Sequence, residues 1–258
     1  MTASATPSSP DDPTVPRRAG VLLHVASLPG GRLGRGAHRL VDWLAEAGFG
    51  WWQILPLRPP DRHGSPYAAR SAFAASPGFL ARPRRRVSAA ERDDFRERNA
   101  YWIDDWARAA GPRAVDDQVR FDREWAELRA HAADRGVRIL GDVPYYVAPG
   151  AADVAAHPRL FRHDAVAGVP PDDFSADGQL WGNPPYDWPA MRRDGYRWWI
   201  ERLRRARELW ECSRIDHFRG FVAWWAVPRR ARTARRGGWM PGPGAAVIAA
   251  ARRELGPL

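Results

Sequence analysis

Two aspartates stand at the ends of apolar runs, where a carboxylate is costly unless it is paired or used. Asp142 closes the run RILGD, and Asp216 follows Arg214 in SRIDH. Alternate residues of a strand point to the same side, so Arg214 and Asp216 are expected to lie together. The arginine would keep the carboxylate ionised, as required of a nucleophile that attacks the anomeric carbon of a sugar. A buried structural ion pair fits this pattern equally well, and Asp142 could equally cap the following loop by accepting backbone N–H bonds.

The elements that would position these side chains follow from the apolar pattern. Short apolar runs predict buried strands at residues 20–25, 51–57, 137–143 and 213–218. Helical spacing predicts helices at about 37–47, 88–110, 117–135, 195–211 and 244–254, and in the fourth of these it places Trp199, Leu203, Ala206 and Trp210 in the core.

Continuous apolar strands separated by helices are typical of parallel sheets covered on both faces. We therefore expect an α/β fold of the (β/α)8 TIM-barrel type, an incomplete barrel in which only the first four strands are present. A doubly wound sheet is the alternative, but no glycine-rich nucleotide fingerprint follows any of the strands. In a barrel, the chemistry lies at the carboxyl ends of the strands, where both aspartates stand.

Composition sets the domain limits and the compartment. Residues 1–18 are rich in Pro, Ser, Thr and Asp and predict a disordered tail, whereas residues 19–258 are assigned to the barrel domain. Residues 145–190 are predicted to be a long groove-forming loop that is functional or contains short elements of its own. No apolar stretch is long enough for a membrane span or a secretory signal, so we expect a cytoplasmic protein. The only cysteine, Cys212, is expected to be buried and inert.

The net charge of +10 raises the question of nucleic acid. All 40 basic residues are arginine, and they are scattered along the chain without forming one stripe. Whole-chain composition explains the charge better than a nucleic-acid site does, so we expect neither nucleic acid nor a membrane as partner.

Five stretches resemble the amylomaltases, the disproportionating enzymes with 4-α-glucanotransferase activity. In family order across residues 19–228, they are GVLLHVASLPG, WWQILPL with SPYAARSAFAASP, RILGDVPYYVAPGAADVAAHPRLF, VAGVPPDDFSADGQLWGNPPYDW and SRIDHFRGFVAWWAVP. The resemblance implies transfer of α-1,4-glucan segments between maltooligosaccharides, with retention of configuration and a covalent glycosyl enzyme. It implies no cofactor and no metal.

The same resemblance assigns roles to residues. Asp216 would be the nucleophile, supported by Arg214, and His217 would contact the sugar beside the scissile bond. The implied substrate-binding residues are Tyr67, which stacks on the attacked sugar, Asp142 in the polar floor, and three residues along the glucan groove, Gln179, Trp181 and Asn183. Rings for stacking and amides for hydrogen bonding suit the apolar faces and hydroxyl edges of sugars.

The sequence departs from the family pattern beyond Asp216. Retaining chemistry needs a second carboxyl group, which serves as acid and base, but the only acidic residue after Asp216 is Glu254. We therefore expect the chain to be inactive alone, with the acid supplied by a separately encoded C-terminal half. The alternative is a non-catalytic glucan-binding remnant or a truncated gene product. The segment between Leu80 and Val137 is also shorter than in the family, and residues 62–64 differ from it.

Overall fold

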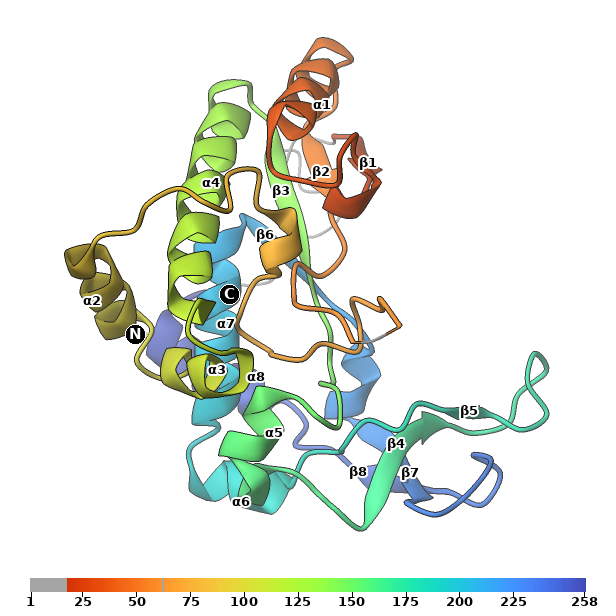
Figure 1. Cartoon of the computed structure of the whole chain (residues 1–258). Coiled ribbons are helices and arrows are strands. Elements are labelled where there is room, and N and C mark those ends of the chain that lie inside the picture. The colour runs from red at the N-terminus through yellow and green to blue at the C-terminus, as the bar shows by residue number, and fades with distance from the viewer. Residues whose placement is uncertain (1–17, 62) are drawn as a thin grey trace, which may run out of the picture.

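The computed structural model describes residues 18–61 and 63–258 (Figure 1). Apart from Arg18, the predicted tail lies outside the described residues. Within the described residues, no helix combines the length and the apolar character needed to cross a membrane.

A parallel sheet contains the four predicted strands. They are shorter than expected and comprise β1 (Gly20–Leu22), β2 (Trp51–Gln53), β3 (Arg138–Val143) and β6 (Cys212–Ile215). Their order in the sheet, β1-β2-β3-β6, is the order in the chain, as expected for successive barrel strands. Asp142 pairs in register with Arg214, so the side chains of these two residues share one side of the sheet. Among the described strands, β1 and β6 each have a neighbour on one side only.

Helices cover this sheet, and the apolar faces predicted from the sequence are buried. The helices at its back are α1 (Arg35–Glu46), α4 (Ala114–Asp134) and α7 (Arg197–Leu209), with α8 (Ala246–Leu255) packed on α7. Trp199, Leu203, Ala206 and Trp210 are each at most 5% exposed. Trp210 packs directly on the backbone of β3 at Gly141, where a Cβ atom would lie 2.0 Å from the indole.

The helix predicted over residues 88–110 is wrong as a single element. It consists of α2 (Ala89–Arg98), which begins with a Ser88–Glu91 capping box, and α3 (Ile103–Ala110). The break occurs at Asn99, whose side-chain amide donates to the carbonyl of Phe95 at 2.9 Å and accepts from the indole of Trp102 at 3.1 Å. The side chain thus ends one helix and anchors the start of the next, an effect that hydrophobic spacing does not register.

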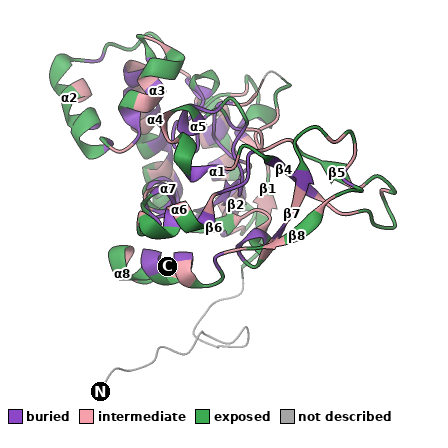
Figure 2. Ribbon diagram, turned by 90° about the horizontal axis from the view of Figure 1, so that it is seen from below, coloured by how far each residue is buried: buried purple, intermediate pink, exposed green. Residues whose placement is uncertain are grey.

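A second sheet, which is antiparallel, was not predicted. It has the order β5-β4-β7-β8 and is formed by β4 (Ala165–Val169), β5 (Gln179–Leu180), β7 (Ala223–Pro228) and β8 (Gly238–Pro241). The segment 145–190 therefore contains short elements, including α5 (Ala152–Ala156) and α6 (Trp188–Arg193), as one of our two expectations for it stated. The β4–β5 hairpin extends away from the helices, and exposed residues cover its outer part (Figure 2).

The prediction of a buried Cys212 is wrong, because its side chain is exposed. It lies on β6, which is an edge strand whose first three residues are all exposed. An apolar neighbourhood in the sequence does not bury a residue where no adjoining strand covers it.

Candidate active site

A pocket of about 260 Å³ opens at the carboxyl ends of the parallel strands. Four segments form its wall: the loop after β2, the segment after β3, the residues after β5 and the turn after β6. The lining residues are Ser65, Tyr67, Ala68, Pro144, Tyr145, Tyr146, Trp181, Asn183, Asp216 and His217. Strand ends that are far apart in the sequence thus meet at one place, as the barrel topology requires.

The pocket brings together most of the residues that the sequence singled out. Asp142 and Arg214 join it through hydrogen bonds to residues of its wall, whereas Gln179 lies outside the lining. The predicted residues in the lining itself are Tyr67, Trp181, Asn183, Asp216 and His217.

Arg214 bridges the two aspartates. Its Nη1 donates to Oδ2 of Asp142 at 2.7 Å, and its Nη2 donates to Oδ1 of Asp216 at 2.5 Å. This geometry follows from the register, because Arg214 lies beside Asp142 in the sheet and two residues before Asp216, which directly follows β6. The hydroxyl of Tyr67 also donates to Oδ2 of Asp142 at 2.7 Å. In the described structure, the Asp142 carboxylate is therefore held by side chains and does not act as a cap for backbone N–H groups.

The two carboxylates differ in how deeply they are buried. The Asp142 side chain is 1% exposed, and this burial raises its pKa, against the opposing effects of the Tyr67 hydrogen bond and the Arg214 charge. Its Oδ1 has no hydrogen-bond partner among the described residues. The Asp216 side chain is one third exposed and faces the pocket. Asp216 is consequently the carboxylate available to a ligand, whereas Asp142 serves to hold Arg214 and Tyr67.

The protonation states of Arg214 and Tyr67 suit this arrangement. Burial acts to lower the pKa of Arg214, but its hydrogen bond to Asp216 and the two carboxylate charges outweigh that effect and raise it. Burial and the hydrogen bond to Asp142 raise the pKa of Tyr67, so its hydroxyl keeps its proton at neutral pH. Arg214 remains a cation that holds both carboxylates, and Tyr67 remains a donor that holds Asp142.

His217 forms the turn that ends β6. Its backbone has a φ of 46°, in the left-handed region that residues other than glycine seldom adopt. Its ring packs edge-on against Trp181, with centroids 4.8 Å apart, and also contacts Tyr145 and Tyr146. Burial lowers the pKa of the imidazole, and Nε2 has no hydrogen-bond partner among the described residues. His217 is therefore a neutral ring at the pocket wall whose Nε2 is buried without a hydrogen-bond partner among the described residues.

The antiparallel sheet supplies the opposite wall. The Asn183 side chain donates to the carbonyl of Val147 at 2.7 Å, which ties this wall to the segment after β3. Gln179 accepts a hydrogen bond of 3.0 Å from the indole of Trp181. Gln179 thus orients the ring that lines the pocket and does not line it itself, and its predicted place along a longer groove stays a prediction.

Sequence reasoning missed several lining residues. Tyr145 and Tyr146 follow Asp142 closely in DVPYYV, and Ala68 follows Tyr67. Their signal was their place directly after two buried strands, at the end of the sheet where barrel chemistry lies. In the described part of the chain, no cluster of three or more His, Cys, Asp or Glu side chains could hold a metal ion.

This chain is similar to known proteins. A family model described as 4-alpha-glucanotransferase matches residues 23–93 and 116–257. The 4-alpha-glucanotransferase of Streptococcus pneumoniae TIGR4 is 34% identical over 94% of this chain and 66% of its own length. The corresponding protein of Thermus thermophilus is 36% identical over 89% of this chain and 64% of its own length.

Among solved structures, that of an amylomaltase from Streptococcus agalactiae in complex with acarbose matches with a TM-score of 0.83 at 30% identity, covering 94% of this chain and 68% of that one. The chain thus spans about two thirds of the length of the curated relatives. The pneumococcal alignment extends over 334 residues, more than the 258 of this chain, so the relative contains segments that are absent here. The expected fold class is confirmed as α/β, with four parallel strands of a TIM-type barrel. The chain belongs to the 4-alpha-glucanotransferase family of the amylomaltases.

Proposed function

We propose that this chain provides the nucleophile side of a 4-α-glucanotransferase site, which moves α-1,4-glucan segments between maltooligosaccharides. The observation that carries the proposal is the pocket-facing Asp216 carboxylate, held by Arg214 at the carboxyl end of a barrel strand. An ionised, fixed and solvent-accessible carboxylate is what attack on an anomeric carbon requires.

The proposed reaction has two displacements. Asp216 attacks the anomeric carbon of the donor, the glycosidic C–O bond breaks, and the leaving oxygen takes a proton from an acid. The 4-hydroxyl of an acceptor glucan then attacks the glycosyl enzyme, loses its proton to the same group and releases Asp216. Two inversions give net retention. Tyr67, Trp181 and His217 would hold the sugar ring, and Asn183 would position the wall that carries Trp181.

The acid is proposed to come from another segment. Retaining enzymes place their two carboxyl groups about 5–5.5 Å apart. Among the described residues, Asp216 alone contributes a carboxylate to the lining. Asp142 is buried behind it, and Glu254 pairs with Arg204 on α7. The chain alone would therefore bind glucan without transferring it.

A separately supplied C-terminal half would provide the acid. The support for this partner is the pair of sheet edges at β1 and β6, each of which has one neighbouring strand among the described residues. Unpaired edges are sites where further strands add. A cytoplasmic location stays a prediction of the sequence.

The deciding experiment incubates the chain with maltotriose, alone and together with the C-terminal segment of an intact relative, and follows glucose and longer oligosaccharides. We expect products only from the mixture, and none when Asp216→Asn replaces the wild type. Products from the chain alone that vanish in Asp216→Asn would place the acid within this chain. Products from the mixture that persist in Asp216→Asn would refute the assignment of the nucleophile.

A glucan-binding remnant without transfer is the second candidate. It is favoured by a pocket that is complete enough to have aromatic walls on two sides within this chain. Calorimetry with maltotriose tests it, and Trp181→Ala should weaken the binding. Binding by the chain together with an inactive mixture would select this candidate over the enzyme.

A further inference from the structure

Arg202 on α7 is a buried cation directly behind the pocket. In the described structure it forms no ion pair, and the buried Asp153 carboxylate acts on its charge only from a longer distance. Arg202 is 1% exposed. Its Nη1 donates to the carbonyl of Tyr145 at 2.9 Å and to the hydroxyl of Tyr186 at 3.2 Å, while its Nη2 donates to the carbonyl of Pro144. Its guanidinium also lies 5.1 and 4.8 Å from the ring centroids of Trp198 and Trp199.

The two carbonyls held by Arg202 belong to the pocket wall. Pro144 and Tyr145 both line the pocket and begin directly after β3. The hydroxyl of Tyr186 donates to the same Tyr145 carbonyl, which therefore has two donors. A backbone carbonyl that accepts a hydrogen bond from a rigid, planar guanidinium has little freedom to move, because the planar group fixes the direction of the hydrogen bond as well as its length.

The position of Tyr145 in turn determines the surroundings of His217. The two rings are edge-to-face with centroids 5.9 Å apart. The turn after β6 approaches the Tyr145 ring so closely that a Cβ atom at Gly220 would lie 2.5 Å from it. A displaced Tyr145 would therefore open the packing around His217 and the neighbouring Asp216.

We propose that Arg202 is a positioning residue of the glucan pocket, which fixes the Pro144 and Tyr145 carbonyls and thereby sets the packing around His217. The identity of the pocket's ligand as a glucan rests on the proposed function, whereas the role of Arg202 in fixing the two carbonyls does not. A purely structural role would not need this residue, because burying a guanidinium without a directly paired carboxylate is expensive and an apolar side chain would fill the space at lower cost. Lysine cannot replace it, since a single ammonium group cannot reproduce the planar arrangement of donors that the guanidinium presents to the two carbonyls.

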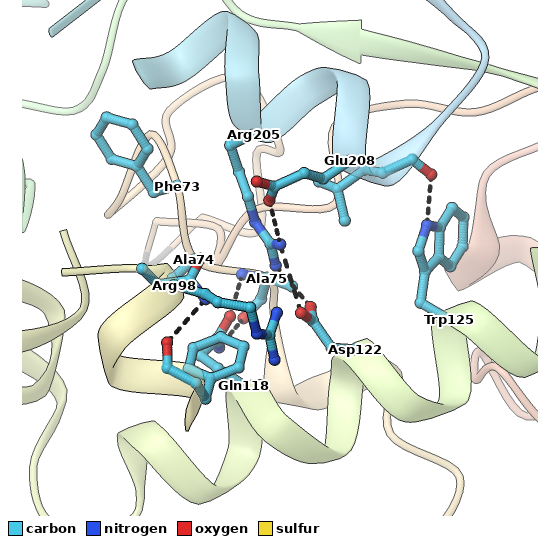
Figure 3. Close-up of polar contacts among 12 residues, drawn as sticks. Phe73, Ala74, Ala75, Arg98, Gln118, Asp122, Trp125, Arg205 and Glu208 are labelled. Atoms are coloured by element: carbon cyan, nitrogen blue, oxygen red, sulfur yellow. Dashed lines mark hydrogen bonds and ion pairs between the residues drawn. The ribbon is translucent and has the colours of Figure 1, made fainter. Parts of the chain in front are cut away.

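The same helix offers a matched control. Arg205 lies three residues further along α7 and is 4% exposed, but it pairs with Asp122 at 2.7 Å and with Glu208 at 3.0 Å (Figure 3). Its guanidinium faces α4, and its hydrogen-bond partners Asp122 and Glu208 lie outside the pocket lining. Arg202→Lys and Arg205→Lys thus each remove a buried guanidinium from α7. The first lies behind the pocket, and the second lies beside α4.

The test compares both lysine variants with the wild-type chain, using NMR titration of His217 and calorimetry with maltotriose. The His217 signal is assigned by its loss in His217→Gln. The groups that face His217 are the Asp216 carboxylate, the Arg219 guanidinium and the phenols of Tyr145 and Tyr146, and all of them are kept in both variants. We expect Arg202→Lys to move the pKa of His217 up towards its ordinary range and to weaken maltotriose binding roughly tenfold, the factor associated with one charge-assisted hydrogen bond. Arg205→Lys should leave both quantities unchanged.

The proposal is overturned if the Arg202→Lys variant folds and the pKa of its His217 equals that of the wild type. If Arg202→Lys does not fold, Tyr186→Phe decides by the same criterion, because it removes one of the two donors to the Tyr145 carbonyl and should shift His217 in the same direction by less. A Tyr186→Phe titration identical to wild type then overturns the proposal. If wild type binds no maltotriose while Arg202→Lys shifts His217, the proposed function fails and the positioning role stands.

Discussion

Arg214 and Arg205 each bridge a pair of carboxylates, but the buried member of the network differs between them. In the pocket, Arg214 joins Asp142 and Asp216, and the buried member is the anion Asp142, at 1% exposure, while the arginine side chain is 43% exposed. Between α7 and α4, Arg205 joins Asp122 and Glu208. There the buried member is the cation, at 4% exposure (Figure 3).

The difference shows what turns an ion-pair network into a candidate for chemistry. Around Arg205 the two carboxylates face solvent outside the pocket and satisfy a charge that is hidden between helices. Around Arg214 a buried carboxylate holds the arginine, and the arginine presents a second carboxylate to a pocket. The first network stabilises packing, whereas the second uses burial to fix a group that remains accessible.

The largest expected effect is that of Arg214→Met. It would leave Asp142 buried with Tyr67 as its one remaining donor among the described residues, and breaking a buried pair in this way costs about 3–5 kcal/mol. Urea denaturation at neutral pH measures this loss. Asp142→Asn in the same background should restore much of the lost stability, because it removes the uncompensated charge.

The cost of Arg214→Met should depend on pH. Burial raises the folded-state pKa of Asp142 above the unfolded value of about 3.9, so its contribution to stability is full below that pH and is lost as the pH rises through the folded-state pKa. Removing Arg214 raises that pKa further. The stability difference between wild type and Arg214→Met should therefore be small near pH 4 and grow towards neutrality; a difference that shrinks with rising pH would contradict the assignment.

At the helix interface, the sensitive partners should be the carboxylates. The double variant Asp122→Asn with Glu208→Gln leaves the buried Arg205 without a carboxylate partner and should lower the free energy of unfolding by about 3 kcal/mol. Arg205→Met removes the buried charge itself and should lower it by about 1 kcal/mol or less. Maltotriose affinity should be unchanged in both proteins. Equal losses in the two proteins would break the comparison, because they would mean that the position of the buried charge is unimportant.

Tyr67→Phe should have a moderate effect. It removes a hydrogen bond to a charged group, worth about 1.5 kcal/mol, and it raises the pKa of Asp142, since that bond lowers it. Denaturation as a function of pH measures both consequences, and the loss should again be greater at neutral than at acidic pH. A loss that does not depend on pH would indicate that Tyr67 contributes by packing alone.

The smallest effect should come from Gln179→Ala. It frees the Trp181 indole from one exposed hydrogen bond and should weaken maltotriose binding about threefold, against roughly tenfold for Trp181→Ala. Calorimetry distinguishes the two factors. If Gln179→Ala weakens binding as much as Trp181→Ala does, then Gln179 contacts the sugar directly and the pocket extends further along β5.

The sequence by itself determined the features that depend on local periodicity. The four parallel strands follow from short continuous apolar runs. The buried face of α7 follows from spacings of three and four, and the placement of Arg214 with Asp216 from a spacing of two. The tertiary structure alone decided which segments meet. Arg214 contacts Asp142 across 72 residues of sequence because β3 and β6 pair in one register. The pairing of β4 with β7 likewise joins segments that are far apart in the sequence. Strand pairing also left Cys212 exposed on an edge strand, since the neighbours of a strand across a sheet leave no periodic signal in its sequence.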